Sequence, residues 1–117
     1  ILACPLTDQT RGLVNADFLA AMQPEAVLVN VARGAVVNDQ ALITALDQGV
    51  IGAAILDVFD PEPLPESSPL WVHDQITVTS HLAGGGAGFL ARNDQLFIDQ
   101  LDNYLAGRPL RLEVMAG

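Results

Sequence analysis

The heptapeptide Leu28-Val29-Asn30-Val31-Ala32-Arg33-Gly34 lies at the centre of the predicted fold. The apolar run 27–31 predicts a buried β-strand. In a parallel sheet, ligands bind at the carboxyl ends of the strands, so an arginine just past such a strand is well placed to bind a carboxylate or a phosphate. Gly34 would allow a tight turn or the close approach of a ligand. Taken alone, the same pattern also fits a surface arginine that happens to follow a strand.

Composition predicts one globular domain and disfavours two classes of partner. The chain has 117 residues, 50% of them hydrophobic, which suffices for one core. Fourteen acidic residues against five arginines and no lysine give a net charge of −9, which disfavours nucleic acid and anionic membranes as partners. No apolar run is long enough to predict a membrane span. The single cysteine, Cys4, cannot form an internal disulfide, which favours a cytoplasmic location.

The remaining pattern predicts alternating strands and helices. Further buried strands are expected at residues 1–4, 53–56 and 76–79, and helices at 16–22, 39–48 and 89–106. Because the chain opens inside the first of these strands, we expect it to be a piece of a longer protein. The order of elements predicts an α/β fold, half of a doubly wound parallel sheet of the Rossmann type with right-handed crossovers. The last helix carries an apolar stripe, comprising Leu90, Phe97, Leu101, Tyr104 and Leu105.

Chemically useful side chains follow three of the predicted strands. Arg33, Glu62 and His81 each come after a different strand, and the carboxyl ends of neighbouring parallel strands converge. Arg33 can bind a substrate carboxylate, His81 can exchange a proton with a carbonyl or hydroxyl oxygen, and Glu62 can fix the imidazole tautomer. Asp57 can accept a hydrogen bond from an amide. Singly, each has a plainer interpretation: a loop histidine, a solvated glutamate, an aspartate that caps a turn.

Two other features of the sequence do not predict a binding or catalytic site. Residues 84–88 are glycine-rich, but they lack the spacing of a dinucleotide fingerprint and the lysine of a P-loop, so we interpret them as a hinge. Cys4 is interpreted as a small apolar residue at a strand end, and no metal site is predicted.

Four motifs together resemble the D-isomer-specific 2-hydroxyacid dehydrogenases. They are residues 4–12 (CPLTDQTRG), 30–34 (NVARG), 56–64 (LDVFDPEPL) and 80–84 (SHLAG), in the order and spacing of that family. The stretch 62–71 is most similar to the glyoxylate/hydroxypyruvate reductase branch. The resemblance implies that 1–106 is the carboxyl-terminal part of an NAD(P)-binding domain, with 107–117 returning to a substrate domain.

The resemblance also implies roles for individual residues. Arg33, Glu62 and His81 would be the catalytic set: Arg33 binds the 2-keto acid, His81 is the general acid, and Glu62 is its partner. Asp57 would bind the nicotinamide carboxamide. The other cofactor-binding positions would be Pro5, Thr10, Val31, Ala32 and Gly84, with Arg33 and His81 also beside the cofactor.

One departure and several alternatives stay open. Ser80 stands where the family usually has proline before the catalytic histidine. The resemblance implies a small 2-keto or 2-hydroxy acid substrate, NAD or NADP as cofactor, and a homodimer; the fragment alone is expected to be inactive. The alternative is a non-enzymatic, dinucleotide-sensing relative that binds a protein partner, as the family's corepressors do.

Overall fold

The computed structural model describes residues 1–111, and the chain divides into two units at residue 84. The first unit is Ile1–Ala83 and the second begins at Gly84. The domain boundary expected at residue 106 stays a prediction.

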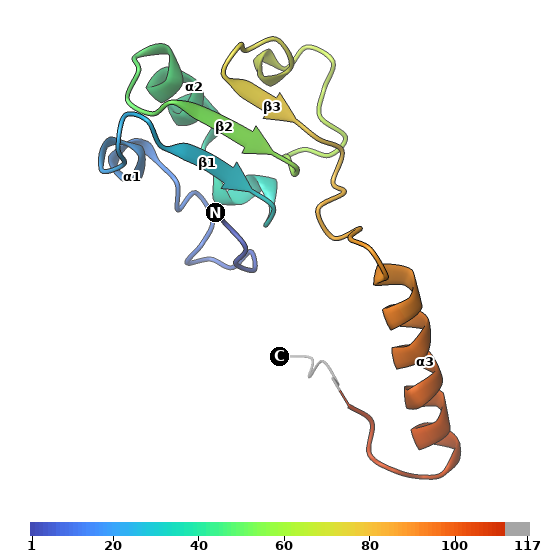
Figure 1. The fold of residues 1–117 in the computed structure, drawn as a ribbon. Helices are drawn as coiled ribbons and strands as arrows, with labels where there is room; N and C mark the ends of the chain where they lie inside the picture. The colour runs from blue at the N-terminus through green and yellow to red at the C-terminus, as the bar shows by residue number, and fades with distance from the viewer. Residues whose placement is uncertain (112–117) are drawn as a thin grey trace. The chain divides into compact units, whose positions relative to one another are not determined.

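A parallel sheet forms the centre of the first unit. Its strands are β1 (Val27–Asn30), β2 (Ala53–Leu56) and β3 (Ile76–Val78), in the order β1-β2-β3 (Figure 1). The register pairs Asn30 with Leu56 and Leu56 with Val78, so the three strands end level with one another. The predicted Rossmann-type α/β class is confirmed.

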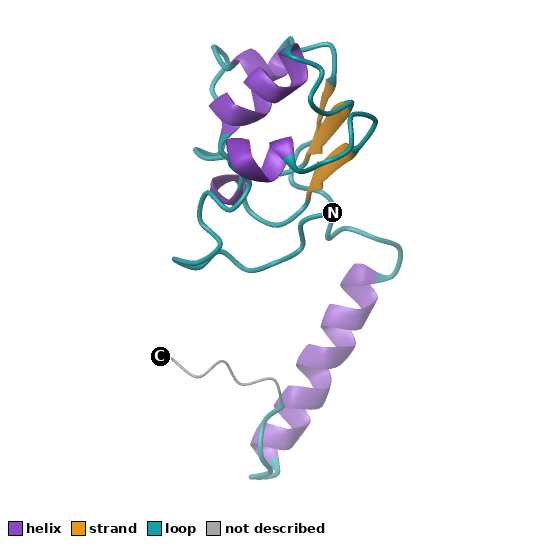
Figure 2. Ribbon diagram, turned by 90° about the vertical axis from the view of Figure 1, so that its left-hand side faces the viewer, coloured by secondary structure: helices purple, strands orange, loops and turns teal. Residues whose placement is uncertain are grey.

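Helices cover one face of this sheet. They are α1 (Ala16–Ala20) and α2 (Asp39–Asp47), together with the 3₁₀ turns η1 (Gly34–Val36) and η2 (Pro69–Trp71), and they lie on the same side of the strands (Figure 2). Asn15 and Asn38 cap the two α-helices by accepting hydrogen bonds from Phe18 N and Ala41 N, as asparagine at this position commonly does.

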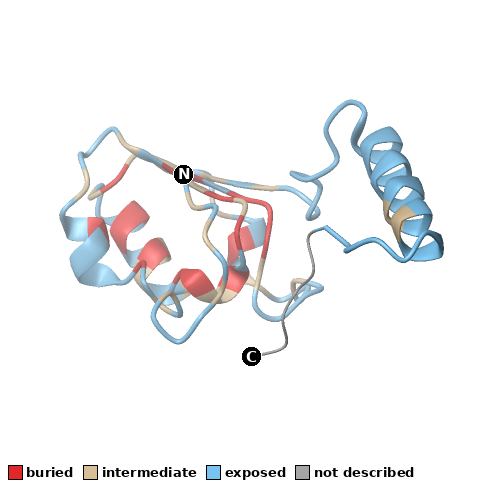
Figure 3. Ribbon diagram, turned by 90° about the horizontal axis from the view of Figure 1, so that it is seen from below, coloured by how far each residue is buried: buried red, intermediate tan, exposed pale blue. Residues whose placement is uncertain are grey.

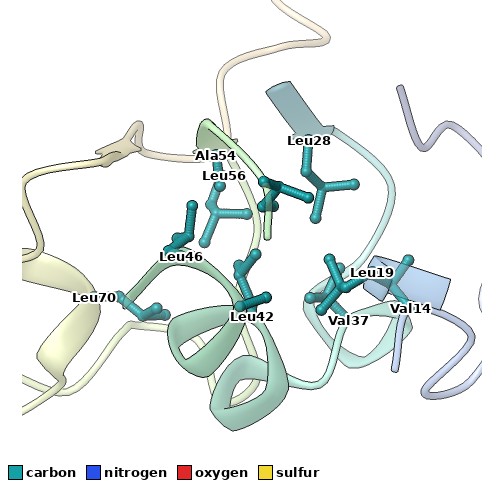
Figure 4. Close-up of a cluster of buried hydrophobic side chains, with 11 residues drawn as sticks. Val14, Leu19, Leu28, Val37, Leu42, Leu46, Ala54, Leu56 and Leu70 are labelled. Carbon is teal, nitrogen blue, oxygen red and sulfur yellow. The ribbon is translucent and has the colours of Figure 1, made fainter. Parts of the chain in front are cut away.

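The core lies between the helices and the covered face of the sheet. Side chains alternate along a strand, so Leu28, Ala54 and Leu56 point into this layer (Figure 4), whereas Val27 and Ile55 are 48% and 38% exposed on the opposite face. The buried residues gather in α2 and along the strands (Figure 3). From the helices and loops the core takes Val14, Leu19, Val37, Leu42, Ala45, Leu46, Ile51 and Leu70.

The prediction of a buried strand over residues 1–4 was wrong. In place of a buried strand over 1–4, Leu2 makes a single parallel bridge to Asn30 through two bonds, Leu2 N to Val29 O and Val31 N to Leu2 O. Ile1 is 90% exposed. Among the described residues, this segment has β1 on one side only, so the apolar letters of 1–4 do not become a buried strand.

The second unit contains the helix α3 (Phe89–Leu105), which follows Gly88 in the left-handed conformation. Its extent matches the prediction to within one residue. None of its side chains is buried, so the predicted apolar stripe is exposed in this structure. Residues 112–117, most of the predicted carboxyl-terminal extension, lie outside the described residues.

Candidate active site

The level strand ends bring the predicted residues to one edge of the sheet. Asp57 N donates to Asn30 O at 3.0 Å and Thr79 N to Leu56 O at 2.9 Å, which continues the ladder one step past each strand. The register aligns Asn30 of β1 and Val78 of β3 with the same residue of β2. Arg33 lies three residues after Asn30, and His81 lies three residues after Val78. The loops that leave the arrowheads in Figure 1 therefore carry these side chains.

His81 and Glu62 form the expected pair. Nδ1 of His81 lies 2.9 Å from Oε2 of Glu62, and the other oxygen, Oε1, accepts from Phe59 N at 2.8 Å. The backbone hydrogen bond from Phe59 first, and then the hydrogen bond and charge of His81 and the charge of Arg33, lower the pKa of Glu62 against the opposing effect of burial. An ionised glutamate only accepts, so Nδ1 carries a proton and Nε2 is the nitrogen available to a substrate.

Asp57 holds the loop that contains His81. Asp57 as a whole residue is 3% exposed, and its carboxylate accepts from the hydroxyl of Thr79, from Leu82 N at 3.0 Å and from Ala83 N at 2.8 Å. Burial is the largest influence on the pKa of Asp57 and raises it, but these hydrogen bonds and the His81 charge together outweigh it, so the pKa is lowered.

The backbone of His81 is in the left-handed region, with φ at 56°. For a residue other than glycine this costs about 1–2 kcal/mol. Leu82 and Ala83, the next two residues, are both bound to Asp57. The bonds on both sides of this turn, from Thr79 and from residues 82 and 83, offset the strain and fix where the imidazole projects.

Arg33 is placed by its own short turn. Asn30 Oδ1 accepts from Ala32 N and Asn30 Nδ2 donates to Arg33 O, both at 3.0 Å, while Nη1 of Arg33 donates to Ala32 O at 2.6 Å. The next residue, Gly34, touches the loop that carries Glu62: a Cβ there would lie 1.9 Å from the backbone carbon of Phe59. Gly34 begins the 3₁₀ turn η1, and the close approach at this position is made by backbone, whereas the sequence analysis had considered a ligand.

An open pocket of about 570 Å³ adjoins the His81–Glu62 pair. Trp71 is one of its walls, and its Nε1 donates to Pro65 O at 2.9 Å, which ties the proline-rich loop to η2. The lining residues are Phe59, Glu62, Pro63, Leu64, Trp71, Val78, Thr79, Ser80 and His81. Arg33 is not among these lining residues.

The other predicted cofactor positions are less directly marked. Thr10 Oγ1 donates to Pro5 O at 2.8 Å and accepts from Thr7 N, so its hydroxyl holds its own loop. Val31 N is bonded to Leu2 O. Gly84 is the first residue of the second unit. The cofactor roles assigned to these residues stay predictions.

The residues present do fit a nicotinamide cofactor at one point. Oδ1 of Asp57 accepts two hydrogen bonds and Oδ2 accepts one. A carboxylate oxygen can accept two, so Oδ2 retains the capacity for one amide N–H, such as that of a carboxamide.

Residues 1–111 contain neither a metal-ligand cluster nor a candidate membrane-spanning helix. No group of three or more His, Cys, Asp or Glu side chains is arranged to hold a metal ion, and no helix is both long and apolar enough to cross a membrane.

Sequence reasoning missed the part played by Asn30. The sequence analysis assigned it no role, yet it is 1% exposed and bonded to the turn of Arg33. A polar amide directly after a buried apolar run was the available signal, because such a group must find hydrogen-bond partners nearby.

A parallel α/β sheet whose level strand ends present an arginine and a histidine–glutamate pair defines a Rossmann-type domain of the dehydrogenase class. Residues 1–83 match the family described as D-isomer specific 2-hydroxyacid dehydrogenase, NAD binding domain. The chain belongs to this family.

Individual relatives agree with this assignment. A glyoxylate/hydroxypyruvate reductase A of Photorhabdus laumondii is 47% identical over 79 residues, which cover 68% of this chain and 25% of that protein. A D-isomer specific 2-hydroxyacid dehydrogenase of Xanthobacter autotrophicus Py2, solved with NADPH and MES, is 43% identical with a TM-score of 0.82, covering 97% of this chain and 46% of that one.

A third example is the NADPH-dependent glyoxylate/hydroxypyruvate reductase of Sinorhizobium meliloti, solved with NADP and sulfate. It is 32% identical with a TM-score of 0.84, over 96% of this chain and 36% of that one. The chain spans between 25% and 38% of the length of the curated relatives it matches.

Proposed function

We propose that this chain supplies the substrate-reducing side chains of an NAD(P)H-dependent reductase of small 2-keto acids. The observation that carries the proposal is the imidazole–carboxylate pair, His81 Nδ1 to Glu62 Oε2 at 2.9 Å, on the sheet edge where Arg33 also projects. Reduction of a carbonyl beside a carboxylate is served by a proton donor for the carbonyl oxygen and by a bidentate cation for the carboxylate.

In this proposal, Arg33 binds the substrate carboxylate through its guanidinium and orients the neighbouring carbonyl. His81 delivers a proton from Nε2 to the carbonyl oxygen as that atom gains charge. Glu62 keeps the other ring nitrogen protonated and holds the ring plane. A bound NAD(P)H supplies the hydride that the carbonyl carbon accepts, and Asp57 Oδ2 would hold the nicotinamide carboxamide.

Glyoxylate and hydroxypyruvate are the substrates we propose first. The support is the naming of similar proteins from Photorhabdus and Sinorhizobium as glyoxylate/hydroxypyruvate reductases. NADPH is the first cofactor to test, since two of the similar solved structures contain NADPH or NADP.

The test is steady-state oxidation of NADPH and NADH at 340 nm by the full-length protein, with glyoxylate, hydroxypyruvate and pyruvate. The matched variant is Arg33→Ala, which removes the carboxylate-binding group. We expect its KM for the keto acid to rise by about 10²-fold, as for the loss of a charge-assisted bidentate contact. Equal KM values in the two proteins would contradict the role of Arg33, and no oxidation by the wild type with any of these acids would contradict the proposed function.

A further inference from the structure

Asn30 is one of only two polar side chains that are buried among residues 1–111. It is 1% exposed, and the other, Asp57, is 3% exposed. An amide removed from water without hydrogen bonds costs about 1–3 kcal/mol, so a buried asparagine needs partners on both its oxygen and its nitrogen. The positions of those partners indicate what the residue does.

Both partners of Asn30 lie in the turn that leads to Arg33. Oδ1 accepts from Ala32 N and Nδ2 donates to Arg33 O, each at 3.0 Å. The two bonds also fix which way round the amide sits, because the reversed amide would set an N–H against Ala32 N–H and an oxygen against the Arg33 carbonyl. The backbone of Asn30 is also held in place, since its backbone carbonyl accepts from Asp57 N, just past the end of β2, at 3.0 Å.

This clamp encloses the peptide group to which the guanidinium binds. Nη1 of Arg33 donates to Ala32 O at 2.6 Å. Asn30 holds Ala32 N on one side of that carbonyl and Arg33 O on the other, so it sets the direction in which Ala32 O points. Because the guanidinium donates to Ala32 O, the side chain of Asn30 acts on the position of the guanidinium through this carbonyl.

We propose that Asn30 is a positioning residue for substrate binding: its buried amide fixes the turn and the acceptor that aim the Arg33 guanidinium. The proposal rests on the proposed function, because it gives Arg33 the carboxylate of the keto acid as its target. It adds a requirement for the amide itself, with one donor and one acceptor, at the end of β1.

Asn30→Asp is the sharpest variant. It keeps an oxygen for Ala32 N but puts a second oxygen where Nδ2 now donates, opposite the carbonyl of Arg33. Asn38→Asp is the matched control, because Asn38 caps α2 by accepting from Ala41 N, and aspartate serves equally well at that position. Asn30→Ser is the second variant: its hydroxyl can still accept from Ala32 N but is too short to bridge to Arg33 O.

The experiment is a double-mutant cycle in the full-length protein between Asn30→Asp and Arg33→Ala, with KM for the keto acid, KM for the cofactor and kcat measured separately. We expect Asn30→Asp alone to raise the keto-acid KM by about 10- to 100-fold and to leave the cofactor KM within about threefold. In the Arg33→Ala background the same change should alter the keto-acid KM by less than about threefold. Asn38→Asp should match the parent in both backgrounds.

An equal effect of Asn30→Asp in both backgrounds would overturn the proposal, because the residue would then act through stability or through another group. If Asn30→Asp does not fold, Asn30→Ser is put through the same cycle with the same two outcomes.

A second measurement does not depend on activity. The side-chain Nε–H NMR signal of Arg33, assigned by its loss in Arg33→Ala, should shift and broaden in the Asn30 variant and remain unchanged in Asn38→Asp. An unchanged signal in the Asn30 variant would refute the clamp even in a protein with no reductase activity, whereas an inactive wild type with a shifted signal would refute only the proposed function.

Discussion

Replacing Gly34 with alanine tests whether the turn of Arg33 and the loop of Glu62 must touch. A Cβ at this position would lie 1.9 Å from Phe59 C, 2.2 Å from Phe59 O and 2.4 Å from Asp60 N. The first of these is about 1.5 Å short of the 3.4 Å at which ordinary contact begins, and every atom involved is backbone. The two loops must therefore separate by more than 1 Å or the strand ends must distort.

The expected cost follows from that displacement. Forcing one extra methyl group into a packed region destabilises a protein by about 1–3 kcal/mol, and displacing reacting groups by about 1 Å lowers turnover by about 10²-fold. We expect Gly34→Ala to show both effects, measured by urea unfolding and by kcat/KM in the full-length protein.

Gly49→Ala is the control for this variant. Gly49 has φ at 67° but nothing within 4 Å of its Cβ position, so its substitution costs about 1–2 kcal/mol of backbone strain without moving the site. It should therefore lose stability and keep its kcat/KM. Wild-type stability and turnover in Gly34→Ala would refute the close approach as described.

Two further predictions concern the carboxylates of the site. Glu62→Gln should lower kcat by about 10²- to 10⁴-fold with little change in the keto-acid KM, because an amide can donate to Nδ1 and stabilise the wrong imidazole tautomer; an unchanged kcat would count against the pair. Asp57→Asn should lower the free energy of unfolding at pH 7 by about 2–3 kcal/mol, since an N–H would face backbone donors. The pKa of Asp57 is lowered in the folded state, so its ionisation stabilises the fold above its ordinary pKa, and this contribution is lost as the pH falls through the lowered value. The difference between wild type and Asp57→Asn in urea unfolding should therefore shrink as the pH falls below the ordinary pKa of an aspartate, and a constant difference would contradict the assignment.

Local sequence patterns predicted the sheet and its ends well. Apolar runs of four or five residues mark β1 and β2, and Asn38 with Gly49 brackets α2, because hydrophobic period and capping are local signals. Strand ends then indicated where side chains would meet, and Nδ1 of His81 lies 2.9 Å from Oε2 of Glu62; the catalytic roles of the two residues stay predictions.

Other features depend on contacts between distant segments and have no local signature. The close approach at Gly34, which leaves no room for a Cβ, involves backbone 25 residues further along the chain. The left-handed backbone of His81 is stabilised by hydrogen bonds from the following residues to Asp57. Residues 1–4 show the converse: apolar letters predicted a buried strand, but burial requires neighbours on both sides.

The most direct test of the account is the rate of NADPH or NADH oxidation at 340 nm with saturating glyoxylate or hydroxypyruvate, compared between the full-length wild type and His81→Gln. Glutamine puts an uncharged amide in place of the imidazole, and an amide cannot deliver a proton as an imidazolium does. We expect steady oxidation by the wild type and a rate lower by about 10²- to 10⁴-fold in the variant. Equal rates in the two proteins would contradict it.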